Sequence, residues 1–233
     1  MSVITISRQF GSGGDQVANR LCEVLGYHAF GKEQILQAAE GTSLSRLNAI
    51  DYSEDNHEVQ SFLEKLFGRS PTTVQKIAWA ENPTIATRPE RADVQDLAVI
   101  GLVKRAIQAA VKAGKMVIIG RGGQALLKNA PGVLHVRIEA PMDTRIERVK
   151  AQLIKESGES RSERALDRAA ADLIATRDKA SADYLKTYHN IDWDDPWLYH
   201  MVLNLGKLSI DQATDIIVAG VSHIGKRPPA PGE

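Results

Sequence analysis

Four short apolar runs stand out along this chain, each bounded by polar or glycine-rich sequence. They are residues 3–6, 116–119, 133–138 and 197–204. Apolar runs of this length without polar alternation are typical of strands that are buried on both faces of a parallel sheet. The four runs therefore predict the central strands of an α/β protein.

Helical periodicity separates these strands. After the first run, Val17, Leu21 and Leu25 recur at helical spacing, and Gly26 supplies a stop. Later helical patterns cover residues 34–40, 58–67, 93–112, 124–128, a helix opened by Pro141, residues 161–186, and a last helix capped by Ser209. Alternating strands and helices predict an α/β fold with a mainly parallel sheet. We predict one domain over residues 1–225 and a disordered, proline-containing tail over 226–233.

Composition removes several classes of protein. The chain of 233 residues has Lys+Arg 29 and Asp+Glu 29, a net charge of zero, so no broad basic field is available for general nucleic-acid binding. No apolar run approaches the ~20 residues of a membrane helix, and the N-terminus lacks a signal-peptide pattern. With Cys22 as its one cysteine, the chain can form no internal disulfide. These features predict a cytoplasmic protein without membrane contact.

The sequence segment between the first predicted strand and the first predicted helix is the candidate ligand site. Gly11, Ser12, Gly13 and Gly14 directly precede Asp15 and Gln16 at the start of the helix. A helix N-terminus offers unpaired N–H groups and a positive dipole end, and glycines let the backbone wrap around an anion. We therefore assign these six residues to phosphate binding. The alternative is a tight turn without a ligand.

The loop departs from the standard phosphate-binding motif G-x-x-x-x-G-K-[ST]. Gly14 stands where the lysine belongs, and Arg8 stands at the first glycine. An arginine fork binds phosphate oxygens well, so Arg8 is a candidate replacement for the missing cation. Asp15 either holds Mg²⁺ through water or caps the helix.

Three sequence segments resemble those of a known protein family. They are residues 4–28 with the R-Q-x-G-S-G-G loop, the strand and Gly-Arg turn of residues 117–123, and residues 203–209. Together they resemble the cytidylate-kinase-like family, and the likeness spreads over about residues 1–223. The resemblance implies a P-loop kinase fold of three layers with a five-stranded, mainly parallel sheet. It also implies a helical acceptor-binding region at about residues 31–90 and a helical lid at about 155–190.

The same resemblance implies ATP and Mg²⁺ as the phosphoryl donor, with cationic side chains around the phosphates. It assigns catalysis to Arg121, Arg168 and Arg177, which join Arg8. We further assign acceptor binding to Lys32, Arg88 and Arg121, and Mg²⁺ binding to Asp15. Arg164 shares a helical face with Arg168, and a solvated helix is the alternative for this pair.

Two functions remain open at this point. The first is phosphoryl transfer from ATP to a nucleoside monophosphate or another small acceptor. The second is a non-catalytic nucleotide- or phosphometabolite-binding protein, because the lysine is lost at Gly14 and the aspartate of the Gly-Arg-Asp phrase is lost at Gly122. A structural α/β domain without a phosphate site is a weaker third, and a homodimer is left open.

Four further residues are predicted to have structural positions without a functional role. Arg145 and Arg148 are predicted at the surface of an early helical turn, and His135 is predicted as a hydrogen-bonded core residue within a strand. Trp197 is predicted to pack in the core under an acidic turn.

Overall fold

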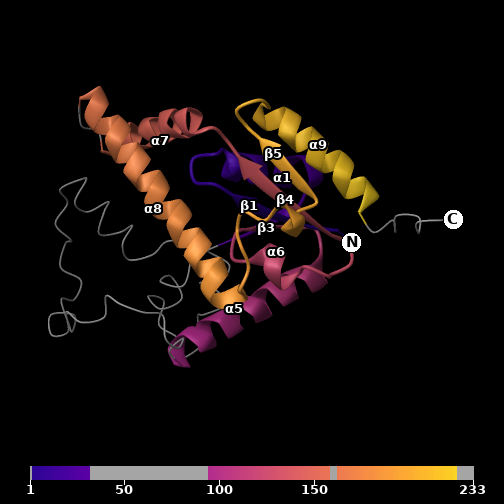
Figure 1. Cartoon of the computed structure of the whole chain (residues 1–233). Helices are drawn as coiled ribbons and strands as arrows, with labels where there is room; N and C mark the ends of the chain where they lie inside the picture. Colours follow the sequence, from indigo (N-terminus) through magenta and orange to yellow (C-terminus); the bar gives the residue numbers. More distant parts are fainter. Residues whose placement is uncertain (1, 32–93, 158–161, 225–233) are drawn as a thin grey trace.

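A computed structural model describes residues 2–31, 94–157 and 162–224. Its sheet contains five parallel strands in the order β2-β3-β1-β4-β5 (Figure 1). The strands are β1 (Val3–Arg8), β2 (His28–Phe30), β3 (Met116–Ile119), β4 (Val133–Glu139) and β5 (Met201–Asn204). The prediction of an α/β fold around a five-stranded parallel sheet is confirmed.

Helices cover both faces of this sheet. Within the described residues they are α1 (Gly14–Leu25), α5 (Val94–Ala113), α6 (Gly123–Leu126), α7 (Met142–Ser157), α8 (Glu163–His189) and α9 (Ile210–His223). Helices α1 and α9 pack together on one face, while α5 and α6 lie on the other. Helix α7 continues from the carboxyl end of β4 and packs along α8 (Figure 1).

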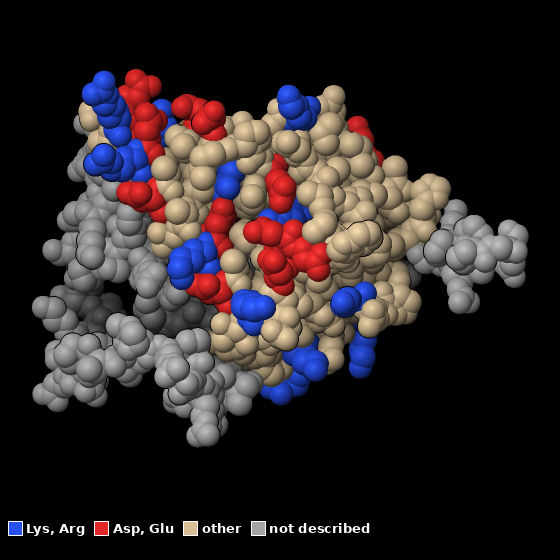
Figure 2. Space-filling model, in the orientation of Figure 1, with Lys and Arg blue, Asp and Glu red and all other residues tan. Residues whose placement is uncertain are grey.

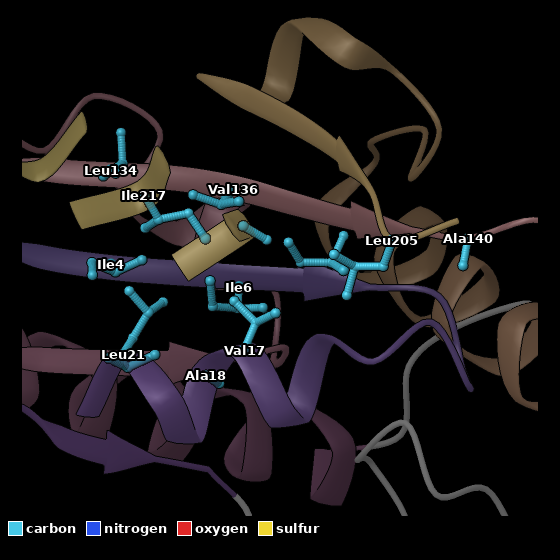
Figure 3. Packing of buried hydrophobic residues seen from close by; sticks show 13 residues of the cluster. Ile4, Ile6, Val17, Ala18, Leu21, Leu134, Val136, Ala140, Leu205 and Ile217 are labelled. Atoms are coloured by element: carbon cyan, nitrogen blue, oxygen red, sulfur yellow. The ribbon is translucent and has the colours of Figure 1, made fainter. Parts of the chain in front are cut away.

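The largest apolar cluster lies between the sheet and helices α1 and α9 (Figure 3). Ile4 and Ile6 of β1 meet Val17 and Leu21 of α1 there, and all four side chains are fully buried. Burying a side chain of this size stabilises the fold by about 1.5–3 kcal/mol. This packing fixes the start of α1 relative to the end of β1, and thereby the loop between them.

The opposite side of the same strands is apolar at Val3, Ile118 and Val133 and polar toward the carboxyl ends of β1 and β4. His135 of β4 shares a 2.8 Å hydrogen bond with Thr5 Oγ1 and approaches the carbonyl oxygen of Leu127 at 3.2 Å. The prediction of a satisfied core histidine is confirmed. Two residues along β4, the guanidinium of Arg137 is 2 % exposed and stacks 4.5 Å from the ring centroid of Trp193.

Some element predictions need correction. The strand β2 was not among the predicted runs, since three residues are too few to show a pattern. The last strand begins at Met201, because Pro196–Leu198 forms a 3-10 turn. Trp197 is 90 % exposed, so its predicted place in the core is wrong, and Trp193 is the buried tryptophan of this turn. The acceptor-binding region beyond Gly31 and the predicted tail lie outside the described residues.

A candidate phosphate site at the end of strand β1

The glycine loop connects the carboxyl end of β1 to α1 and borders a cavity of about 530 Å³. Gly13 is the N-cap of α1 with φ 93°, and Ser12 is completely buried beneath it. The cavity is lined by loop residues, by the first turns of α1, and by Arg148 and Lys155 of α7. A concave site therefore exists where the sequence predicts phosphate binding.

Four backbone N–H groups along this loop are not used within the described part of the chain. No hydrogen bond there involves the N–H of Gly11, Gly13, Asp15 or Gln16, and all four residues line the cavity. Asp15 and Gln16 are exposed in the first turn of α1, where N–H groups have no intrahelical acceptor. Successive unpaired N–H groups at a helix N-terminus can form a nest for an anion. The loop thus has the donors that phosphate oxygens require.

The other side of the loop is tied to helices α7 and α8. Phe10 donates its N–H to Asp178 Oδ1 at 2.9 Å, and its carbonyl accepts from Arg145 Nε at 2.8 Å. Arg145 also forms a short ion pair with Asp178. One buried charge pair therefore satisfies both backbone groups of Phe10.

Arg148 adds a second tie. Its guanidinium donates to the carbonyl of Ser12 at 2.5 Å and to that of Leu205, after β5, at 3.0 Å. Burial lowers the pKa of Arg148 below its usual value. Arg145 is 4 % exposed, and Arg148 is half-buried and donates to two backbone carbonyls, so the surface interpretation of both arginines is wrong. They were missed because arginine early in a helix is usually solvated, although Arg145 lies one helical turn before buried Val149, which is a signal for the inner face.

Arg8 occupies the space beside Gly14. A Cβ atom added to Gly14 would lie 2.5 Å from Arg8 Cβ and 2.9 Å from Arg8 Cγ. No side chain fits at residue 14 while Arg8 holds this position. The missing lysine and the arginine at the end of β1 are therefore sterically linked, which the sequence alone does not reveal.

The guanidinium of Arg8 binds the carboxylate of Asp15, with 2.9 Å between Nε and Oδ1. Asp15 is the acidic residue of the first turn of α1, and its side chain is 64 % exposed. Gly13 rather than Asp15 is the N-cap. The described residues contain no cluster of three or more His, Cys, Asp or Glu side chains that could hold a metal, so Mg²⁺ at Asp15 would need oxygens from a bound nucleotide or water.

A second turn at the carboxyl edge follows β3. Gly120, Arg121 and Gly122 have φ values of 63°, 60° and 67°, three left-handed residues in succession. For Arg121 this conformation costs roughly 1–2 kcal/mol, and such strain concentrates at functional sites. Arg121 is 8 % exposed. The imidazole of His189, at the end of α8, lies against Gly122: an added Cβ would be 2.6 Å from its Nε2.

The remaining predicted residues are dispersed. Arg177 lies beside the loop, with its guanidinium carbon 5.3 Å from the centroid of the Phe10 ring. Arg168 and Arg164 are exposed on α8, and neither lines the cavity. Lys32 and Arg88 lie outside the described residues. Their assigned roles stay predictions.

Charge is mixed on the molecular surface shown in Figure 2, where carboxylates gather over the centre and basic side chains lie scattered around them. No helix in the described ranges has the length and apolarity needed to cross a bilayer.

Comparison with known proteins now adds to this geometry. The model of the cytidylate kinase-like family matches residues 3–207. The chain belongs to the cytidylate kinase-like family. The match includes the glycine loop, the turn after β3 and the end of β5, so the resemblance seen in the sequence is confirmed. No curated protein matches the chain.

One of three solved structures compared with this chain shares its fold. An uncharacterized protein from Eubacterium ventriosum ATCC 27560 is 20 % identical with a TM-score of 0.62, and the alignment covers 95 % of this chain and 99 % of that chain. Shikimate kinase from Acinetobacter baumannii, solved with shikimate, is 11 % identical (TM-score 0.45, 95 % and 93 % covered). A Thermus thermophilus protein, TT1252, is 14 % identical (TM-score 0.43, 94 % and 97 % covered). At 20 % identity the likeness to the Eubacterium ventriosum protein concerns the fold alone.

Proposed function

We propose that this protein transfers the γ-phosphoryl group of ATP–Mg²⁺ to a small acceptor. The observation that carries the proposal is the set of N–H groups, at Gly11, Gly13, Asp15 and Gln16, that are unused within the described residues and belong to residues lining a cavity at the end of β1. Backbone donors in this arrangement bind phosphate oxygens. Membership of a kinase-like family supports ATP as the source of those oxygens.

In this proposal each arginine side chain has a separate role. Arg8 takes over the charge that a lysine at residue 14 would supply, since its stem occupies that space. In this proposal Arg121 contributes its charge from the turn after β3, and Arg177 and Arg168 contribute theirs from α8. Phosphoryl transfer depends mainly on positioning and charge neutralisation, so arginines are suited to it. Asp15 would hold Mg²⁺ through water once a nucleotide binds.

Acceptor binding falls to Arg121 together with Lys32 and Arg88 in this proposal. The identity of the acceptor is a separate matter, because the segment that carries Lys32 and Arg88 lies outside the described residues. A nucleoside monophosphate and a small alcohol are both compatible with the loop.

Ligand binding without transfer is the second candidate. It is favoured by the ion pair of Arg8 with Asp15, which neutralises the relocated cation. The two candidates predict the same binding of ATP and differ in turnover. Thermal unfolding with ATP–Mg²⁺ measures the binding of ATP, since any ligand of the native state raises Tm. Release of ADP with nucleotide and alcohol acceptors measures turnover. Tight binding of ATP with no ADP release would favour the non-catalytic candidate.

The steric link between Arg8 and Gly14 gives a sharper test. Gly14→Lys alone should weaken pyrophosphate binding, because its side chain collides with the stem of Arg8. Arg8→Gly combined with Gly14→Lys removes the collision and restores a cation, so binding should return toward the wild-type value. If Arg8→Gly alone binds pyrophosphate as the wild type does, Arg8 does not replace the lysine.

A further inference from the structure

We propose that His189 accepts a proton from the phosphoryl acceptor, and that this acceptor is therefore a hydroxyl compound rather than a phosphate monoester. The inference rests on the proposed function, and it concerns the turn after β3 that carries Arg121 of the proposed acceptor site, not the residues that line the cavity. It begins from a side chain that the mechanism above leaves unused.

The imidazole of His189 lies directly over the α-carbon of Gly122. A Cβ atom at residue 122 would be 2.6 Å from Nε2 and 3.0 Å from Cδ2, so no side chain at this position is compatible with the ring. Gly122 follows β3, which pairs with β1, and the N–H of Gly120 bonds to the carbonyl of Ile6 at 2.9 Å. The ring thus lies at the edge of the sheet where β1 ends in Arg8.

Nε2 of His189 makes no hydrogen bond within the described residues. The atom is buried, and no hydrogen-bond partner for it exists among the residues that the structure describes. A buried polar atom without a partner costs roughly 1–3 kcal/mol, and such groups in native proteins call for an explanation. A ligand group that supplies the missing hydrogen bond is one.

The surroundings favour the neutral ring. Burial lowers the pKa of His189 below its usual value, so at pH 7 the imidazole can accept a proton. Tyr184 contacts the ring edge-on with centroids 5.5 Å apart. Arg121 directly precedes Gly122 in the turn against which the ring lies. No described carboxylate bonds to the ring, so His189 is not engaged in an ion pair.

This chemistry distinguishes two acceptor classes. A phosphate monoester is largely ionised at pH 7, with a second pKa of about 6, and its attacking oxygen carries no proton to remove. An alcohol keeps its proton until transfer. In the proposed step the hydroxyl oxygen forms a bond to the γ-phosphorus and its proton passes to Nε2 of His189. The bond from the γ-phosphorus to the bridging oxygen breaks, and ADP leaves with that electron pair.

Water is itself a hydroxyl acceptor, so the test needs no knowledge of the natural substrate. The measurement is slow ADP release from ATP–Mg²⁺ in the wild type, His189→Gln and the control His223→Gln, whose side chain is exposed at the end of α9. We expect His189→Gln to lose about 100-fold or more of the rate, as general bases contribute about 10²–10⁴-fold. The acid limb of the pH profile should disappear with it. The control should match the wild type.

ATP binding separates this inference from the proposed function. The rise of Tm with ATP–Mg²⁺ should be the same in all three proteins. A wild type whose Tm does not respond to ATP would remove the proposed function and this inference together. Intact binding with equal rates and pH profiles in the wild type and His189→Gln would overturn the role of His189 alone. So would transfer to CMP, UMP or AMP that His189→Gln leaves unchanged.

A double variant guards against a folding artefact. His189→Gly with Gly122→Asp removes the imidazole and lets a carboxylate grow from the turn into the vacated space. Aspartate tolerates a positive φ better than most residues. We expect part of the lost rate to return, with the acid limb moved toward the aspartate pKa of about 4. An inactive double variant that unfolds at the wild-type Tm would contradict a proton acceptor at this place.

Discussion

The two sides of the glycine loop differ in how their backbone groups are used. The N–H and carbonyl of Phe10 and the carbonyl of Ser12 are all bonded to charged side chains of α7 and α8. The N–H groups of Gly11, Gly13, Asp15 and Gln16, whose residues line the cavity, are unused within the described residues. We call these the strapped side and the open side.

This difference shows how a fold keeps donors free for a ligand. Glycine-rich backbone left to itself would close on its own N–H groups or lose its shape. Holding Phe10 and Ser12 from outside fixes the loop without using the inner donors. The strapped side therefore determines the geometry of the open side, and mutations on the two sides should have separable effects on stability and on binding.

Breaking the strap should have the largest effect. Asp178→Ala leaves Arg145, 4 % exposed, without its ion-pair partner and frees the N–H of Phe10. We expect the free energy of unfolding to fall by about 3 kcal/mol, at the lower end for a buried pair because Asp178 is 22 % exposed. Pyrophosphate binding should weaken as well. Urea unfolding measures the first effect and calorimetry the second.

Asp183→Ala is the matched control. Asp183 lies on the same helix and pairs with Lys179 at 2.5 Å, but both side chains are exposed. Its removal should cost at most about 1 kcal/mol. Equal losses in the two variants would show that the strap has no special part in holding the loop.

Acid should lower the stability of the whole fold through His135. Burial, and next the nearby His200, lowers the pKa of His135 to about 4. In the unfolded chain a histidine titrates near 6.5, so below that pH the unfolded state binds a proton that the folded state refuses. Stability should therefore decrease as the pH falls from about 6.5 to 4, by at most about 2.5 kcal/mol at about pH 4.5.

The check is urea unfolding at about pH 7 and about pH 4.5 for the wild type and His135→Gln. The variant loses the Thr5 bond at every pH, but the fall between the two pH values should be smaller by the histidine contribution. An unchanged pH dependence in His135→Gln would assign the acid sensitivity to other groups.

Filling the open side should have a smaller effect on stability and a larger one on binding. Gly13→Ala places a methyl group 2.9 Å from Leu205 Cδ1 and 3.3 Å from Arg148 Nη1, at φ 93°. We expect a loss of about 2 kcal/mol from overpacking and the left-handed backbone together. Pyrophosphate binding should drop, because the N–H of Gly13 belongs to the nest.

Gly26→Ala isolates the backbone contribution. Gly26 ends α1 at φ 64°, and an added Cβ meets nothing within 4 Å. This variant should lose only about 1 kcal/mol and keep its pyrophosphate affinity. If Gly13→Ala behaves in the same way, Leu205 and Arg148 do not constrain the loop.

The open side could be predicted from the sequence, whereas the strapped side could not. Strand, glycines and helix follow one another within residues 3–25, so local patterns identify the loop and the family. The strap joins Phe10 to Asp178, which are 168 residues apart. The link of Arg8 to Gly14 is close in sequence, but it depends on side-chain contact that spacing does not encode. The contact of His189 with Gly122 could not be predicted for both reasons, because the two residues are far apart in the sequence and meet through a side chain. The prediction for Trp197 was wrong because the sequence of the acidic turn is equally compatible with burial of Trp193 or of Trp197.

Asp15→Asn should have the smallest effect on stability and the most informative effect on binding. The ion pair with Arg8 is largely exposed, so its loss should change the free energy of unfolding by under about 1 kcal/mol. Without Mg²⁺, removing a carboxylate beside the nest should strengthen pyrophosphate binding, because Arg8 is released and a negative charge is gone. With Mg²⁺, the same variant should bind more weakly if Asp15 holds the ion. Calorimetric titrations with pyrophosphate, with and without Mg²⁺, measure whether the variant binds more strongly or more weakly than the wild type in each condition. Stronger binding in both conditions would mean that Asp15 only restrains Arg8, and the assignment of Mg²⁺ to this carboxylate would then be wrong.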